Sequence, residues 1–117
     1  MSDLNRKQAE FTLHIARLLV WANENGIPCS GAEWFRTPEQ AEIYVKAGKG
    51  IKNSNHCKRL ALDIFCLDES GSVTWEMPQY EKLGAKWKSM HPLARWGGDI
   101  PKLRDAVHFS FEHMGVV

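Results

Sequence analysis

A carboxylate stands inside an apolar run near the middle of the chain. Asp63 is the only charged residue of segment 60–65, LALDIF, which has the composition of a β-strand. Burying a carboxylate is costly unless a partner compensates its charge. A metal ion is one candidate partner, and His56 lies seven positions before Asp63. A metal site at this strand requires a third ligand elsewhere in the chain.

Hydrophobic periodicity predicts three helices and several short strands. Apolar residues at helical spacing predict a first helix over 4–25. Thr37, Pro38 and Gln40 form a capping-box pattern that predicts a second helix over 38–47, and a third should begin near Pro78. Strands are expected over 26–35, 59–67, 72–76 and 106–114, with 59–76 forming a hairpin and 94–105 a loop. The fold class is therefore α+β, with a small, mostly antiparallel sheet in a single domain over 1–117.

Composition excludes several classes of protein. The chain has 117 residues, a net charge of +1 and a pI near 7.8, which do not favour a nucleic-acid partner. Its apolar stretches are too short to span a bilayer, and its first residues do not resemble a secretory signal. We expect a monomer that is made in the cytoplasm and does not insert into membranes. The three cysteines form no CxxC pair and are expected to be free thiols.

The third ligand candidate is His108, on the last expected strand. His108 and Asp63 are separated by 44 residues, and His108 should lie on the face of its strand opposite the aromatic residues. Two histidines and one carboxylate are the donors of an open zinc site that holds one ion. The spacing of His56 and Asp63 suits a loop ligand followed by a strand ligand. The alternative is that the three residues occur together by chance.

Two further residues match the chemistry of a hydrolytic zinc site. Asp105 precedes His108 by three positions, and a carboxylate there can accept a proton from water and deliver it to a leaving amine. Arg36 offers a fixed positive charge for the oxyanion of a tetrahedral intermediate. The alternatives are a loop acid for Asp105 and a surface arginine paired with a neighbouring acid for Arg36.

Three motifs in order resemble the D-alanyl-D-alanine carboxypeptidase family of zinc peptidases. SNHCKRLALDI resembles its Ser-x-His-x(6)-Asp motif, ARWGGD followed by DAVHFSFE resembles its Trp-Gly-Gly loop and Asp/Glu-x-x-His segment, and EWFRTPEQAEIYVKAGKG resembles its upstream arginine segment. The resemblance spans about residues 34–112. The short length looks most like the phage endolysin branch, whose members cleave the L-alanyl-D-glutamate bond of peptidoglycan.

The resemblance implies roles for eight residues. His56, Asp63 and His108 would bind one Zn²⁺, Asp105 would act as general base and acid, and Arg36 would polarise the scissile carbonyl. The remaining three would lie near the substrate, and each has a structural alternative. Ser54 could stabilise its loop, Gln40 could serve only as a capping residue, and Trp96 could belong to the core.

The resemblance also implies a function, with alternatives left open. It implies an L-alanyl-D-glutamate endopeptidase that acts on the stem peptide of peptidoglycan after release through a holin lesion or from the virion. The alternatives are a D-alanyl-D-alanine carboxypeptidase and a zinc-containing, non-catalytic binding module on the same fold. Many members of the family have glycine where this chain has Arg59, which leaves open whether the loop between His56 and Asp63 differs and whether this bulky cation narrows the cleft or meets a substrate carboxylate.

Overall fold

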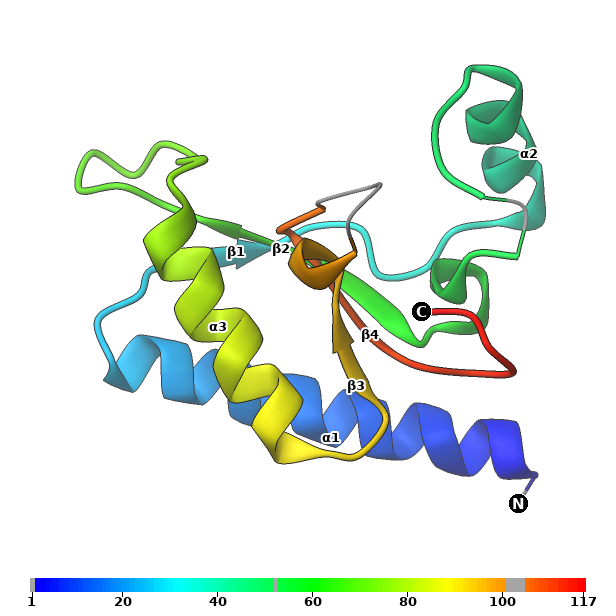
Figure 1. The fold of residues 1–117 in the computed structure, drawn as a ribbon, viewed down its shortest axis with the longest axis horizontal. Helices are drawn as coiled ribbons and strands as arrows, with labels where there is room; N and C mark the ends of the chain where they lie inside the picture. The colour runs from blue at the N-terminus through cyan, green and yellow to red at the C-terminus, as the bar shows by residue number, and fades with distance from the viewer. Residues whose placement is uncertain (1, 52, 101–104) are drawn as a thin grey trace.

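The centre of the domain is a four-stranded antiparallel sheet. The computed structural model describes residues 2–51, 53–100 and 105–117, and the sheet has the order β1-β2-β4-β3 (Figure 1). Its strands are β1 (Cys29–Gly31), β2 (Ala61–Cys66), β3 (Ala94–Trp96) and β4 (His108–Phe111). The expected α+β class with three helices and a small antiparallel sheet is confirmed.

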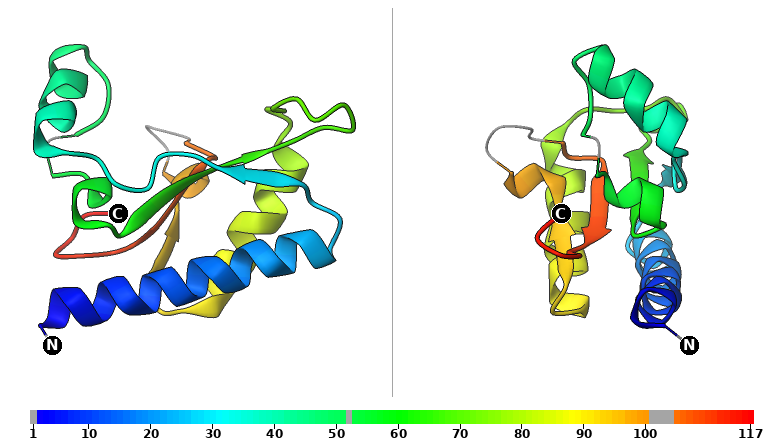
Figure 2. Two further views of the ribbon diagram at one scale, coloured as in Figure 1. Left: turned by 180° about the vertical axis from the view of Figure 1, so that it is seen from behind. Right: turned by 90° about the vertical axis from the view of Figure 1, so that its right-hand side faces the viewer.

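Two helices cover the apolar side of this sheet. Helix α1 (Asp3–Glu24) runs along the body of the domain, and α3 (Met77–Met90) lies across α1, as Figures 1 and 2 show. The expected apolar stripe of α1 is buried, and Trp87 of α3 stacks on Phe111 with ring centroids 5.4 Å apart. Burying each large apolar side chain contributes roughly 1.5–3 kcal/mol. The sheet and these helices share one core, which includes Phe11, Ile15, Leu18, Leu62, Ile64, Tyr80, Leu83, Trp87, Phe109 and Phe111.

Helix α2 (Pro38–Lys46) begins where the capping pattern predicts. Thr37 accepts a hydrogen bond from the backbone N–H of Gln40, and Pro38 occupies the first turn. Only Ala41 of α2 is buried, so the helix projects from the body of the domain (Figures 1 and 2). The segment that enters α2 carries Arg36 toward the sheet.

The expected hairpin over 59–76 is only partly correct. After β2 the chain turns at 68–71, but its return is a single bridge between Leu67 and Val73. The hydroxyl of Tyr80 accepts a hydrogen bond from the Cys66 N–H and donates one to the Thr74 carbonyl. A side chain of α3 therefore occupies the edge that a longer returning strand would need.

The expected loop over 94–105 contains a strand and a helical turn. Ala94–Trp96 pair with Phe109–Phe111 as β3, and Gly97–Asp99 form the 3₁₀ helix η2. Because β2 pairs with only one edge of β4, the other edge is free to bind this short segment. Residues 101–104 of the expected loop lie outside the described residues.

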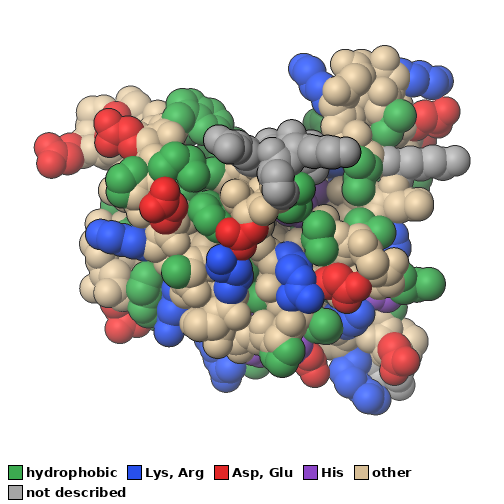
Figure 3. Space-filling view, in the orientation of Figure 1, with side chains coloured by type: hydrophobic (Ala, Val, Ile, Leu, Met, Phe, Trp, Pro, Cys, Tyr) green, Lys and Arg blue, Asp and Glu red, His purple; other side chains and the backbone are tan. Residues whose placement is uncertain are grey.

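The surface carries both signs of charge. On the face drawn in Figure 3, acidic and basic side chains are interspersed, in line with the net charge of +1. Among the described residues, no helix combines the length and hydropathy needed to cross a membrane.

Candidate active site

Strand register brings together two of the expected metal ligands. Asp63 of β2 and His108 of β4 are direct cross-strand partners, which puts their side chains on the same face of the sheet. Leu62 and Ile64 point to the opposite, core-facing side. The alternation of β2 thus buries its apolar residues while presenting Asp63 beside His108.

The third residue, His56, lies on a short 3₁₀ helix just before β2. This helix, η1 (Asn55–Lys58), begins at Ser54, whose hydroxyl accepts a hydrogen bond from the His56 N–H. The side chain of Asn55 is fully buried and donates to the carbonyl oxygens of Phe111 and Val116. These bonds attach η1 to the end of β4, so that His56 faces the Asp63–His108 pair.

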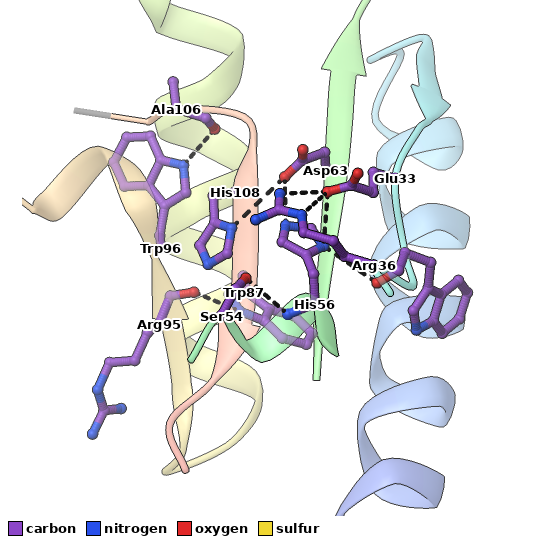
Figure 4. Close-up of polar contacts among 11 residues, drawn as sticks. Glu33, Arg36, Ser54, His56, Asp63, Trp87, Arg95, Trp96, Ala106 and His108 are labelled. Atoms are coloured by element: carbon purple, nitrogen blue, oxygen red, sulfur yellow. Dashed lines mark hydrogen bonds and ion pairs between the residues drawn. The ribbon is translucent and has the colours of Figure 1, made fainter. Parts of the chain in front are cut away.

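The three side chains form a compact donor set for a metal ion. Their ligand atoms lie within 4.8 Å of one another, with His56 Nε2 at 3.2 Å and His108 Nδ1 at 3.7 Å from Asp63 Oδ1 (Figure 4). This buried oxygen has no hydrogen bond of ordinary geometry. Two imidazoles directed at an unsatisfied carboxylate oxygen are the donor types of an open zinc site, so the residues fit the ion that the sequence predicts.

The imidazoles keep Asp63 ionised. Burial acts to raise the pKa of Asp63, but its close polar and charge interactions with His108 and His56 outweigh burial and lower this pKa to about 2. A carboxylate must be deprotonated to bind a metal, and Asp63 is in this state throughout the neutral range.

Asp105 lies beside the donor set in the same pocket. The pocket is lined by the three candidate ligands together with Arg36, Ser54, Gly97, Asp105 and several aliphatic residues. Although Asp105 as a residue is exposed, its carboxyl group is partly desolvated at the pocket. This burial and the charge of Asp63 raise the pKa of Asp105, while His108 and His56 act in the opposite direction.

Arg36 faces the pocket and is also paired. Its Nε lies 2.8 Å from Oε1 of Glu33, and Nη2 contacts the same oxygen. The side chain is 11% exposed, and its guanidinium carbon lies 4.8 Å from the centre of the Tyr44 ring. Arg36 is therefore a pocket residue that also pairs with a neighbouring acid, and its role at the oxyanion stays a prediction.

The expected substrate-contacting residues differ in position. Ser54 lines the pocket and also caps η1. Gln40 does not line this pocket, and its backbone N–H takes part in the cap of α2. Trp96 is 7% exposed and belongs to the core, and its indole N–H donates to the Ala106 carbonyl. The structure therefore favours a capping role for Gln40 and a core position for Trp96 over a position near the substrate.

Steric crowding explains why both positions after Trp96 are glycine. A Cβ atom at Gly97 would overlap the Asp105 carbonyl oxygen and lie 2.9 Å from the Cβ of His108. A Cβ atom at Gly98 would overlap the indole of Trp96. Gly97 thus allows η2 to approach the turn that carries Asp105 and His108, and it lines the pocket itself.

Arg59 does not line this pocket, so it does not narrow the cleft. It follows η1 in the left-handed backbone region, with φ of +54°, which is a conformation that favours glycine. Its side chain lies in a separate groove beside α1 with Trp34 and Phe35, 5.8 Å from the centre of the Phe35 ring. The cap geometry explains why glycine suits this position, and the direction of the side chain leaves the pocket open.

Other histidines and cysteines lie outside the donor set. His91 contacts Glu10 of α1, and His113 contacts Lys7. Cys57, next to His56, borders a different hollow near α2, and Cys29, Cys57 and Cys66 are all free. None of these residues belongs to the donor set, and the cysteines are free thiols, as expected.

The structure adds residues that sequence reasoning did not single out. Glu33 contacts Arg36 and lies near His56, Asn55 attaches η1 to β4, and Tyr44 packs on Arg36. Glu33 and Arg36 are three positions apart in an extended segment, where this spacing does not predict a contact. The other three contacts join separate parts of the fold, and no local pattern marks them.

Comparisons with known proteins agree with this architecture. No known family profile matches the chain. The L-alanyl-D-glutamate peptidase of Listeria phage A118 is 34% identical over 114 residues, which cover 93% of this chain and 40% of the phage protein. The chain thus spans about 40% of the length of that relative.

A solved structure has the same fold. The crystal structure of the L-Ala D-Glu endopeptidase ChiX of Serratia marcescens matches with a TM-score of 0.76, over 89% of this chain and 79% of that chain, at 23% identity. The fold and the site define an α+β domain in which Asp63 and His108 of the sheet and His56 of η1 form a two-histidine, one-aspartate donor set. The sequence match confirms the predicted resemblance to the L-alanyl-D-glutamate peptidase branch, and the solved structure confirms the fold.

Proposed function

We propose that this chain is a zinc-dependent endopeptidase that cleaves the L-alanyl-D-glutamate bond in the stem peptide of peptidoglycan. The observation that carries the proposal is the pocket in which His56, Asp63 and His108 converge beside Asp105 and Arg36. The names of the phage relative and of the Serratia structure support this bond as the one cleaved.

The proposed mechanism divides the work among the pocket residues. His56, Asp63 and His108 would hold one Zn²⁺, which when bound supplies Lewis-acid polarisation of a carbonyl and a lower pKa for water. Asp105 accepts the proton of the attacking water and later donates it to the leaving nitrogen. Its raised pKa suits this exchange, because a group that must give the proton back needs an affinity for it.

Arg36 stabilises the negative charge that develops on the scissile carbonyl oxygen. Glu33 occupies Nε and Nη2 of its guanidinium, which leaves Nη1 free of Glu33. An oriented cation in a partly desolvated pocket is worth more than one in bulk water, because water does not have to reorganise around it. The low exposure of Arg36 therefore supports a role in the transition state.

Localisation and partners follow from the same proposal. The substrate is the peptide part of the bacterial cell wall, and we propose that the protein reaches it without membrane insertion, after holin-type release or as part of a virion. We also propose that the domain acts as a monomer.

The test is to identify the products from defined muropeptides. The purified protein, supplied with zinc, is incubated with them, and the products are analysed by mass spectrometry. A new D-glutamate N-terminus is expected, and it should be absent with the His108→Ala variant. Loss of a single terminal D-alanine would overturn the bond assignment in favour of a carboxypeptidase. Intact muropeptides with zinc bound would overturn hydrolysis in favour of the binding module.

A further inference from the structure

The carboxylate of Glu33 contacts two functional groups of the site at once. One oxygen, Oε1, bonds to Arg36 through Nε and Nη2 and lies 3.8 Å from Nδ1 of His56 (Figure 4). The Glu33 side chain is 25% exposed, whereas Arg36 is 11% and His56 is 2% exposed. Glu33 is thus the negative charge that lies between a pocket cation and a candidate metal ligand.

The backbone fixes Glu33 next to the metal ligands. Its carbonyl accepts the N–H of Asp63, and the preceding Ala32 donates its N–H to the carbonyl of Asp63. These two bonds place both Ala32 and Glu33 opposite Asp63, just beyond the last regular pair of β1 and β2 at Gly31. The backbone therefore holds Glu33 beside the residue that carries the candidate ligand.

Arg36 is held from two sides. Glu33 binds one edge of the guanidinium, and the Tyr44 ring lies against its plane, 4.8 Å from the guanidinium carbon. Gly50, with φ of +68°, leaves room beside Nη1, because a Cβ atom there would lie 3.3 Å from this nitrogen. A long side chain held in this way binds its ligand without first losing conformational freedom.

His56 lies near the same carboxylate on its other edge. Its Nε2 faces Asp63, while Nδ1 lies 3.2 Å from the Trp34 carbonyl oxygen and 3.8 Å from Oε1 of Glu33. The Trp34 carbonyl at Nδ1 favours the tautomer with its hydrogen there, which leaves the lone pair on Nε2 for a metal, and the charge of Glu33 acts on the ring from a longer distance. Glu33 also offsets the positive charge of Arg36 near a site built for a cation.

We propose that Glu33 is a positioning residue that serves both halves of the site. It holds the Arg36 guanidinium toward the substrate, and its negative charge beside His56 lowers the positive potential at the metal site. Substrate orientation and metal affinity therefore depend on one carboxylate. The Arg36 half of this inference rests on the proposed peptidase function, and the His56 half does not.

The test compares Glu33→Gln with Glu42→Gln. Glutamine keeps the size of the Glu33 side chain and removes its charge, and Glu42 is an exposed acid that pairs with Lys46 on α2. Zinc affinity is measured by competition with a chromogenic chelator, after circular dichroism has established that each variant is folded. We expect Glu33→Gln to weaken zinc binding about 10-fold or more, as outer partners of metal ligands do, and Glu42→Gln to leave it unchanged.

Kinetics on muropeptides separate a positioning role from a general structural one. Glu33→Gln should lower kcat about 10-fold or more, because Arg36 acts in the transition state. In an Arg36→Ala background, measured at saturating zinc, the same change should lower kcat little further. Glu33→Asp, which keeps the charge, should recover part of both losses.

Two results would overturn the inference. If Glu33→Gln leaves zinc affinity unchanged, Glu33 does not act on the metal site through His56. If Glu33→Gln lowers kcat in the Arg36→Ala background as much as it does in the wild type, Glu33 does not act through Arg36. If the wild-type protein cleaves no muropeptide, the proposed function fails and the Arg36 half fails with it. The zinc titration still decides the His56 half in that case.

Discussion

At the scale of single residues, the buried oxygen of Asp63 determines the chemistry of the site. It lies on a strand whose alternate residues are fully apolar, and it faces two imidazoles without an ordinary hydrogen bond. A group of this kind is costly to bury unless its charge is compensated. The two imidazoles lower the pKa of Asp63 to about 2, and a bound cation would compensate the negative charge of its carboxylate further.

Asp105 is the residue whose change should separate metal binding from catalysis. Asp105→Asn keeps the size of the side chain but cannot accept a proton, so we expect kcat to fall about 10²- to 10⁴-fold. Zinc should remain at one ion per chain, because His56, Asp63 and His108 are intact. Turnover of muropeptides and zinc content are the two measurements.

A matched control for Asp105→Asn is Asp99→Asn. Asp99 lies on η2 and pairs with Lys88 at 2.7 Å, away from the donor set. It should retain turnover close to that of the wild type. Near-normal turnover in Asp105→Asn itself would remove Asp105 from the proposed mechanism.

At the scale of elements, the last residues of the chain hold the site together. Asn55 of η1 donates to carbonyl oxygens on both sides of the turn that follows β4. The same turn is attached to α1, because Lys7 Nζ lies 2.9 Å from Nδ1 of His113. The position of His56 therefore depends on contacts among η1, β4 and α1.

The attachment of this turn to α1 should depend on pH. Burial and the positive charges of Lys7 and Lys58 lower the pKa of His113 from 6.5, and the carboxylate of Glu112 opposes them. A lowered folded-state pKa means that the neutral imidazole is favoured by folding. Its contribution to stability is thus present above about pH 6.5 and is lost as the pH falls.

Urea unfolding of the wild type and of His113→Gln checks this dependence. The difference in the free energy of unfolding between the two proteins should be larger near about pH 7.5 than near about pH 5.5. Using the difference cancels the titration of the other histidines, which both proteins share. A difference that stays constant, or grows toward acid pH, would show that His113 does not behave in this way.

At the scale of the whole molecule, the donor set joins distant parts of the chain. His56, Asp63 and His108 lie on η1, β2 and β4, and the pocket also includes residues from the segments before α2 and after β3. An ion bound only in the folded state stabilises every one of these connections, since binding is linked to folding.

Removing zinc should therefore lower the Tm. If free zinc exceeds its Kd about 1,000-fold, binding contributes roughly 4 kcal/mol to stability. For a domain of this size we expect a Tm lower by roughly 10–20 °C after chelation. Differential scanning fluorimetry with and without EDTA measures the shift. The His108→Ala variant should show a much smaller one, and an equal shift in both proteins would exclude this site as its source.

The sequence alone determined the local elements and the chemistry of the candidate residues. Helical periodicity, the Thr37 cap and the strand alternation around Asp63 were sufficient for the helices and for β2. Each of these patterns depends on side chains and hydrogen bonds within a few positions of one another, which a sequence displays directly. The residue types at 56, 63 and 108 likewise indicated a metal without any geometry.

Only the tertiary structure decided how these parts meet. The strand edges that remain free decide that β3 pairs with β4 and that the hairpin is short. The register between β2 and β4 decides that Asp63 meets His108, although 44 residues separate them in the sequence. Arg59 points away from the pocket because η1 ends in the left-handed region. Glu33 reaches His56 because backbone pairing holds it beside Asp63. These outcomes depend on contacts between segments far apart in the chain, so no local pattern in the sequence specifies them.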